Sequence, residues 1–191
     1  LKRIRNESTP FKKRAKNFPE PINLIIRPYP HIKLMSSPGW KILEELFRKE
    51  EVYLSSPGSI DAAGDRKSEL RQDLNFEEGP DELSYFLRYS DVMINYFSTI
   101  SLEAAICDLP AIHLGYDLYT YGHRFHLTAE FLQRQTHNKR ELRLAASRVA
   151  KNEDELIQYI KMYLEDRTID REARYEYAVS ECGELDGLAG K

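Results

Sequence analysis

Residues 90–114 constrain the fold more than any other part of the chain, because two short apolar runs enclose a hydroxyl-rich turn and a short helical segment. Residues 92–94 and 111–114 have the length and the apolar character of buried strands, and residues 99–107 have the character of a helix. Two strands joined by a crossover helix pair in parallel. The stretch therefore predicts a strand–helix–strand unit of a parallel sheet.

The same alternation of strands and helices continues on both sides of this unit. Residues 55–80 interrupt it with prolines, glycines and no period, which predicts a long loop. The whole pattern predicts an α/β protein with a doubly wound, mainly parallel Rossmann-like sheet and flanking helices. Further strands are expected at 22–26, 52–54 and 147–150; further helices at 40–49, from 81, within 127–135, from Asn152 with Glu155 as a capping box, and from 169 to 182 before Gly183.

Length and charge limit the organisation of the chain and its partners. The 191 residues suit one domain, expected over residues 21–187, with a tail at 188–191. A net charge of −3 argues against nucleic acid as a partner, and no apolar run is long enough to span a bilayer. Residues 1–20 are basic, and two interpretations stay open: a linker from a missing N-terminal domain, or a patch that meets a membrane surface.

The turn after residue 94 is the strongest candidate for a binding site, since ligands of doubly wound sheets lie beyond the carboxyl ends of the strands. Ser98, Thr99 and Ser101 surround the start of the predicted helix. Capping that helix requires only one of these hydroxyls, so all three together favour a phosphate site. Glu103 follows one helical turn after Thr99, where it could accept hydrogen bonds from ribose hydroxyls or be a surface glutamate near the helix start.

A second candidate segment follows the strand at 111–114. Asp117, His123 and His126 lie there among aromatic residues, which suits a sugar and phosphate contact loop or aromatic packing against another domain. A metal site is the third reading, but the spacing defines neither ligand number nor geometry, so no metal is expected. We also find no P-loop, dinucleotide fingerprint or nucleophile elbow, which weakens the ATPase, dehydrogenase and hydrolase classes.

The segment 91–105, together with Asp108-Leu-Pro-Ala-Ile112, resembles the donor-domain signature of GT-B glycosyltransferases. The resemblance is to the branch shared by CDP-glycerol glycerophosphotransferase-like and UDP-N-acetylglucosamine 2-epimerase-like proteins. It extends to Arg27-Pro-Tyr-Pro30 and to the tail segments 163–166, 170–174 and 182–187. It covers most of residues 22–187, and its central motif is more specific for the superfamily than for the substrate.

The resemblance implies a role for each matching residue. Ser98 and Thr99 would contact the donor diphosphate and Glu103 the ribose, while Ser101 stays a nucleotide-binding candidate on its position beside them. Arg27 would lie near the phosphates as a catalytic group, where its guanidinium matches phosphate oxygens. Tyr29 stands where the family has histidine, so His31 is the candidate replacement. Tyr29 is a candidate contact to the sugar or phosphate, together with Asp117 and His123, which are candidates from their own segment and not from the resemblance.

The function implied is the donor-nucleotide-binding half of a GT-B-type transferase that moves a glycosyl or polyol-phosphate group in surface polysaccharide biosynthesis. The expected partners are a nucleotide-activated sugar or polyol donor and the missing N-terminal domain, without a cofactor. The expected location is the cytoplasm, with the full-length protein at the inner face of the membrane as an alternative. Two other functions stay open: a UDP-N-acetylglucosamine 2-epimerase-like isomerase domain, and a non-catalytic nucleotide-sugar-binding module.

Overall fold

The computed structural model describes residues 22–27, 52–54, 81–117 and 129–187. The chain divides into two compact units, residues 1–78 and 79–191. In the first unit, β1 (Leu24–Ile26) and β2 (Val52–Leu54) pair in parallel, with Leu24 opposite Val52. Both strands were expected. The expected helix at 40–49 lies outside the described residues, and a single domain over 21–187 stays a prediction.

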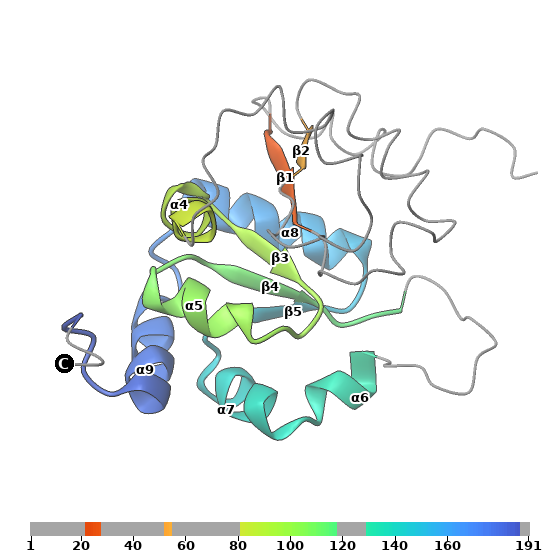
Figure 1. Ribbon diagram of the computed structural model, residues 1–191. Coiled ribbons are helices and arrows are strands. Elements are labelled where there is room, and N and C mark those ends of the chain that lie inside the picture. Colours follow the sequence, from red (N-terminus) through yellow and green to blue (C-terminus); the bar gives the residue numbers. More distant parts are fainter. Residues whose placement is uncertain (1–21, 28–51, 55–80, 118–128, 188–191) are drawn as a thin grey trace, which may run out of the picture. The chain divides into compact units, whose positions relative to one another are not determined.

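The second unit is built on a three-stranded parallel sheet with the order β3-β4-β5 (Figure 1). Its strands are β3 (Met93–Asn95), β4 (Ala111–Leu114) and β5 (Arg148–Ala150). Asn95 lies opposite His113, and His113 lies opposite Val149. Neighbouring residues in register project to the same face of a sheet. The register therefore brings the polar side chains of Asn95 and His113 together.

Helices cover both faces of this sheet (Figure 1). α5 and α7 lie on one face and α8 on the other, while α9 packs against α5 and α7. The arrangement is α/β with a parallel sheet flanked by helices, as the alternation of strands and helices predicted. The helices are α4 (Asp81–Tyr89), α5 (Ile100–Ile106), α6 (Ala129–Gln133), α7 (Thr136–Leu144), α8 (Glu153–Glu165) and α9 (Arg171–Cys182).

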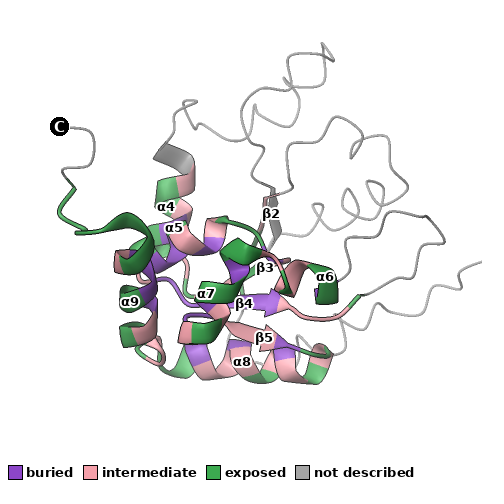
Figure 2. Cartoon of the chain, turned by 90° about the horizontal axis from the view of Figure 1, so that it is seen from below, coloured by how far each residue is buried: buried purple, intermediate pink, exposed green. Residues whose placement is uncertain are grey.

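The buried residues concentrate along β4 and on the helix faces that surround it (Figure 2). Ile112 and His113 of β4 are both fully buried. Small side chains bring α5 and α9 together, since Ala105 and Ala178 form one cluster with Ala146 and Tyr177. Gly115 directly follows β4. A Cβ atom added to it would lie 2.4 Å from a side-chain carbon of Val149 and 3.0 Å from the Ala150 carbonyl oxygen. Only glycine fits this close approach.

The expected helix ends agree well with the structure at two positions. The Asn152 side chain accepts a hydrogen bond from the Glu155 amide at 2.9 Å, which confirms the cap at the start of α8. The Glu155 carboxylate bonds the amide of Lys151 rather than that of Asn152, so the capping box is displaced by one residue. α9 ends before Gly183, which has φ +79°. Glycine adopts this conformation without steric cost.

Helix α7 was not predicted, and its composition explains why. Two of its inward positions carry polar residues, Asn138 and Glu141, which are 1% and 2% exposed. Helical periodicity is read from apolar residues, so a helix that buries an amide and a carboxylate gives a weak signal. The helix expected within residues 127–135 is confirmed by α6, which occupies residues 129–133.

An arginine clasp, formed by Arg167, Arg171 and Arg174 around Asp108, joins the end of α5 to the α8–α9 connection. The Arg174 side chain is 1% exposed and donates to Asp108 Oδ1 from Nη2 at 2.7 Å. Its guanidinium also reaches the carbonyl oxygens of Ile169 and Arg167. Arg171 binds the second oxygen of Asp108 at 2.8 Å. Asp108 has φ +52°, a conformation that aspartate and asparagine tolerate better than most residues.

Replacing Asp108 with asparagine should lower the free energy of unfolding by about 2 kcal/mol, because the buried Arg174 loses the carboxylate with which it is directly paired. A fully buried pair would cost about 3–5 kcal/mol, and the partial exposure of Asp108 reduces this. Urea denaturation measures the change.

The control for this prediction is Arg134→Gln, which breaks the exposed pair between Arg134 and Glu130. It should cost less than about 1 kcal/mol. Equal losses in the two variants would show that the clasp is not what holds these elements together.

Candidate functional site

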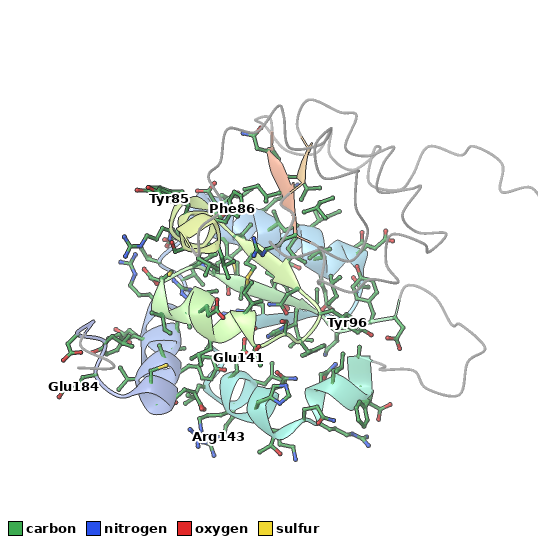
Figure 3. All side chains as sticks on the ribbon, in the orientation of Figure 1. Tyr85, Phe86, Tyr96, Glu141, Arg143 and Glu184 are labelled. Carbon is green, nitrogen blue, oxygen red and sulfur yellow. The ribbon has the colours of Figure 1, made fainter. Side chains whose placement is uncertain are left out.

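The candidate site is the turn Asn95–Thr99, at the carboxyl end of β3, with the segment that follows β4 beside it. Figure 3 shows Tyr96 at this edge of the sheet. Phe97 has φ +52° and its ring stacks on the imidazole of His113, with centroids 4.6 Å apart. A positive φ at a bulky residue is uncommon and costs roughly 1–2 kcal/mol. Burial and stacking of the Phe97 ring offset this cost and hold the turn in shape.

Ser98 and Thr99 present their side chains to solvent. Thr99 occupies the cap position of α5, as expected of one of the two, but its hydroxyl makes no capping hydrogen bond. Among the described residues, no acceptor faces the backbone N–H of Thr99 or Ile100. α5 has only seven residues, so its dipole is small. What the turn offers an anion is therefore hydroxyls and loop amides.

Ser101 differs from the two residues before it. Its side chain is 2% exposed, and its hydroxyl donates to the Ser98 carbonyl oxygen at 2.7 Å. The Ser101 hydroxyl oxygen in turn accepts from Asn95 Nδ2 at 3.2 Å. The structure thus separates the three predicted hydroxyls into two that face solvent and one that holds the turn from inside.

A buried polar network lies directly beneath the turn. Nδ1 of His113 lies 2.7 Å from Asn95 Oδ1, and Nε2 lies 2.8 Å from Glu141 Oε1. His113 is fully buried and Glu141 is nearly so. Figure 3 shows Glu141 on α7. The network connects α7 through β4 to the end of β3.

The turn is also tied to the segment after β4. The hydroxyl of Tyr96 donates to Asp117 Oδ1, and the same oxygen accepts from the amide of Ala129, the first residue of α6. Burial and the hydrogen bond to the Asp117 carboxylate raise the pKa of Tyr96 to about 12. Tyr96 is therefore a neutral hydrogen-bond donor at physiological pH. Asp117, a predicted ligand contact, links β3, β4 and α6.

The other predicted site residues are distributed over both units. Glu103 lies exposed on α5, one turn after Thr99. Arg27 follows β1 in the first unit and is partly buried. Tyr29, His31 and His123 lie outside the described residues. In the part of the chain that the structure describes, Ser98, Thr99, Glu103 and Asp117 share one end of the second unit.

Sequence reasoning missed Asn95, His113 and Glu141. A histidine inside an otherwise apolar strand was a usable signal for His113, because a buried polar side chain needs partners. Asn95 gave a weaker one, at the end of an apolar run. Glu141 gave none, since its position in a polar, basic segment is typical of a solvated helix face.

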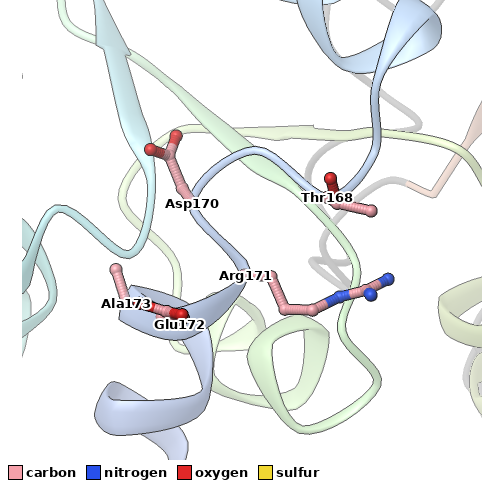
Figure 4. A pocket seen from close by; sticks show the side chains of 5 residues that line it. All are labelled: Thr168, Asp170, Arg171, Glu172 and Ala173. Atoms are coloured by element: carbon pink, nitrogen blue, oxygen red, sulfur yellow. The ribbon is translucent and has the colours of Figure 1, made fainter.

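A hollow open to solvent lies at the start of α9 and is lined by Thr168, Asp170, Arg171, Glu172 and Ala173 (Figure 4). Its main charged groups are engaged in the fold. The Asp170 carboxylate accepts from Arg148 at 2.6 and 2.7 Å and from the Tyr163 hydroxyl at 2.8 Å. Arg171 points away from Asp170, toward Asp108. The hollow therefore offers less for a ligand than the turn does.

Asp170 gives stability a pH dependence whose direction follows from its surroundings. Burial alone would raise its pKa, but the hydrogen bonds from Arg148 and Tyr163 and the charge of Arg174 outweigh burial, so the pKa is lowered. A carboxylate with a lowered folded pKa stabilises the fold fully above its unfolded pKa, about 4, and loses this contribution as pH falls toward the folded value.

Asp170→Asn should therefore be clearly less stable than the wild type at pH 7. The difference should shrink below about pH 4, where Asp170 of the unfolded wild-type chain binds a proton before Asp170 of the folded protein does. Urea unfolding of both proteins at pH 7, 5, 4 and 3 measures this. A difference that stays constant over that range would contradict the assignment.

The described residues contain neither a membrane-spanning helix nor a metal-binding cluster. None of their helices is long and apolar enough to cross a bilayer. They contain no group of three histidine, cysteine, aspartate or glutamate side chains placed to hold a metal ion. No protein-family model matches the chain, and neither does any curated protein or solved structure.

Proposed function

We propose that this chain is the donor-nucleotide-binding half of a GT-B-type transferase that moves a glycosyl or polyol-phosphate group, in the assembly of a surface polysaccharide. The finer fold prediction, a doubly wound Rossmann-like sheet over residues 21–187, belongs to the same proposal. So do the proposed catalytic roles of Arg27 and His31 and the sugar contacts from Tyr29 and His123. The role of Arg27 is carried over from the family resemblance, and the fold prediction rests on the alternation of strands and helices.

The observation that supports the proposal most is the turn at the end of β3. The exposed hydroxyls of Ser98 and Thr99 lie beside two backbone N–H groups without acceptors among the described residues. Exposed hydroxyls and amides in one turn suit the oxygens of a phosphate. The turn stands beyond the carboxyl end of a strand in a parallel sheet, where α/β proteins bind their ligands.

The neighbouring residues fit a nucleoside diphosphate better than a bare anion. Glu103 lies one helical turn from Thr99 and is exposed, so its carboxylate can accept hydrogen bonds from the ribose hydroxyls. The proposed chemistry is direct transfer. Hydroxyls and amides that stabilise the departing diphosphate as its negative charge grows lower the barrier for such a step. Arg27 would add a full positive charge to that group.

Calorimetric titration of the chain with UDP, CDP, GDP, ADP and inorganic pyrophosphate tests the proposal. One nucleotide should bind with a Kd between micromolar and millimolar. The double variant Ser98→Ala, Thr99→Ala should weaken both this nucleotide and pyrophosphate by roughly 10–100-fold, because hydrogen bonds to charged groups contribute about 1.5–3 kcal/mol. Glu103→Ala should weaken the nucleotide and leave pyrophosphate unchanged.

Thr136→Ala is the matched control, because Thr136 is an exposed hydroxyl residue at the start of α7. Its affinities should equal those of the wild type. Binding that the double variant leaves intact would refute the turn as the phosphate site. A wild-type chain that binds none of the five compounds would refute the nucleotide-binding function itself.

A further inference from the structure

A chain of hydrogen bonds runs from Glu141 on α7 to the backbone of the turn. It passes from Glu141 to His113 at 2.8 Å, from His113 to Asn95 at 2.7 Å, and from Asn95 to the Ser98 amide at 3.3 Å. Glu141, His113 and Ser101 are at most 2% exposed. Three polar groups in the interior of so small a unit cost free energy even when they are paired. Their arrangement therefore calls for a reason beyond stability.

The direction of each hydrogen bond in this chain is fixed by chemistry. The Ser98 amide can only donate, so the Asn95 atom that faces it is the carbonyl oxygen Oδ1. The Asn95 amide nitrogen then faces Ser101 Oγ, whose own proton goes to the Ser98 carbonyl oxygen. Because Oδ1 accepts, Nδ1 of His113 must carry the proton that it donates to Asn95.

The other ring nitrogen of His113 faces the buried carboxylate of Glu141. The hydrogen bond between Nε2 and Oε1 locks the imidazole in the orientation that directs Nδ1–H at Asn95. The Phe97 ring stacks on the same imidazole, and the two ring planes are nearly parallel, with 5° between them. The imidazole is thus held from two edges and from one face.

We propose that His113 is a positioning residue for the ligand-facing turn. Its Nδ1–H fixes the side-chain amide of Asn95, and Asn95 Oδ1 closes the turn on the Ser98 amide. The closed turn keeps Phe97 at positive φ and leaves the N–H groups of Thr99 and Ile100 without acceptors among the described residues. Glu141 acts one step further away, by holding the ring. The effect of His113 on ligand affinity rests on the proposed nucleotide-binding function. Its effect on the conformation of the turn does not.

Replacing the His113–Glu141 pair with apolar residues distinguishes a role in positioning the turn from a role in stability alone. In the double variant His113→Phe, Glu141→Leu, the ring volume and the stack on Phe97 are kept and no buried charge is left unpaired. Well-packed apolar residues often replace a buried polar pair without loss of stability. We expect this variant to fold, to bind pyrophosphate at least tenfold more weakly than the wild type, and to shift the amide NMR signals of Thr99 and Ile100.

The second part of the test is a conservative variant of Glu141 that should keep the hydrogen bonds and the affinity. In Glu141→Gln, the glutamine amide can donate to Nε2 while Nδ1 keeps its proton, so every bond of the chain survives with a neutral imidazole. We expect wild-type pyrophosphate affinity within twofold, a protonated Nδ1 and a bare Nε2 in the ring-nitrogen NMR spectrum. The control Asn138→Ala removes a buried amide of α7 that bonds the Leu132 carbonyl oxygen. It should reduce stability and keep the affinity.

The outcomes distinguish this inference from the proposed function. If the apolar double variant keeps both its affinity and the amide signals of the turn, His113 is only a core residue. A bare Nδ1 in the wild type would overturn the inference even if the double variant fails to fold. If the wild type binds no pyrophosphate or nucleotide, the proposed function fails, and the ring-nitrogen spectrum and the amide shifts of the turn still decide whether His113 positions it.

Discussion

A fully buried imidazole must find hydrogen-bond partners for its two ring nitrogens, and much of the second unit is arranged around that requirement at His113. The partners come from different elements. Asn95 ends β3 and lies in register beside His113, while Glu141 reaches in from α7. Strand pairing alone would bring Asn95 close. Only the packing of α7 beneath β4 supplies the second partner.

The polar interactions of the second unit divide into two groups with different tasks. At the carboxyl end of the strands, the network around His113 and the bond between Tyr96 and Asp117 shape a turn that faces solvent. Elsewhere, the arginine clasp on Asp108 and the bonds of Asp170 to Arg148 and Tyr163 hold α5, β5, α8 and α9 together. The first group leaves hydroxyls and amides available to a ligand. The second uses its charged groups within the fold.

The residues that carry the family resemblance also divide into those that hold the fold together and those that face solvent at the turn. The tail segments that carry part of the resemblance include Tyr163, Asp170 and Arg174, and the structure shows all three in contacts within the protein. These three side chains hold the fold together and are not available to a substrate. The functional part of the resemblance therefore lies in the turn, where the exposed Ser98 and Thr99 support the proposed phosphate contact.

The sequence by itself determined the local features of this protein. The strands at 93–95, 111–114 and 148–150 follow from short apolar runs, the start of α8 from Asn152, and the end of α9 from Gly183. Each depends on residues that are close in the chain. The tertiary structure alone decided that Ser101 turns inward, that α7 buries Asn138 and Glu141, and that His113 links α7 to the turn. The two hydrogen bonds of His113 join residues 18 and 28 positions apart. Which polar groups meet at such separations is set by the packing of helices on the sheet, not by any local pattern of apolar residues.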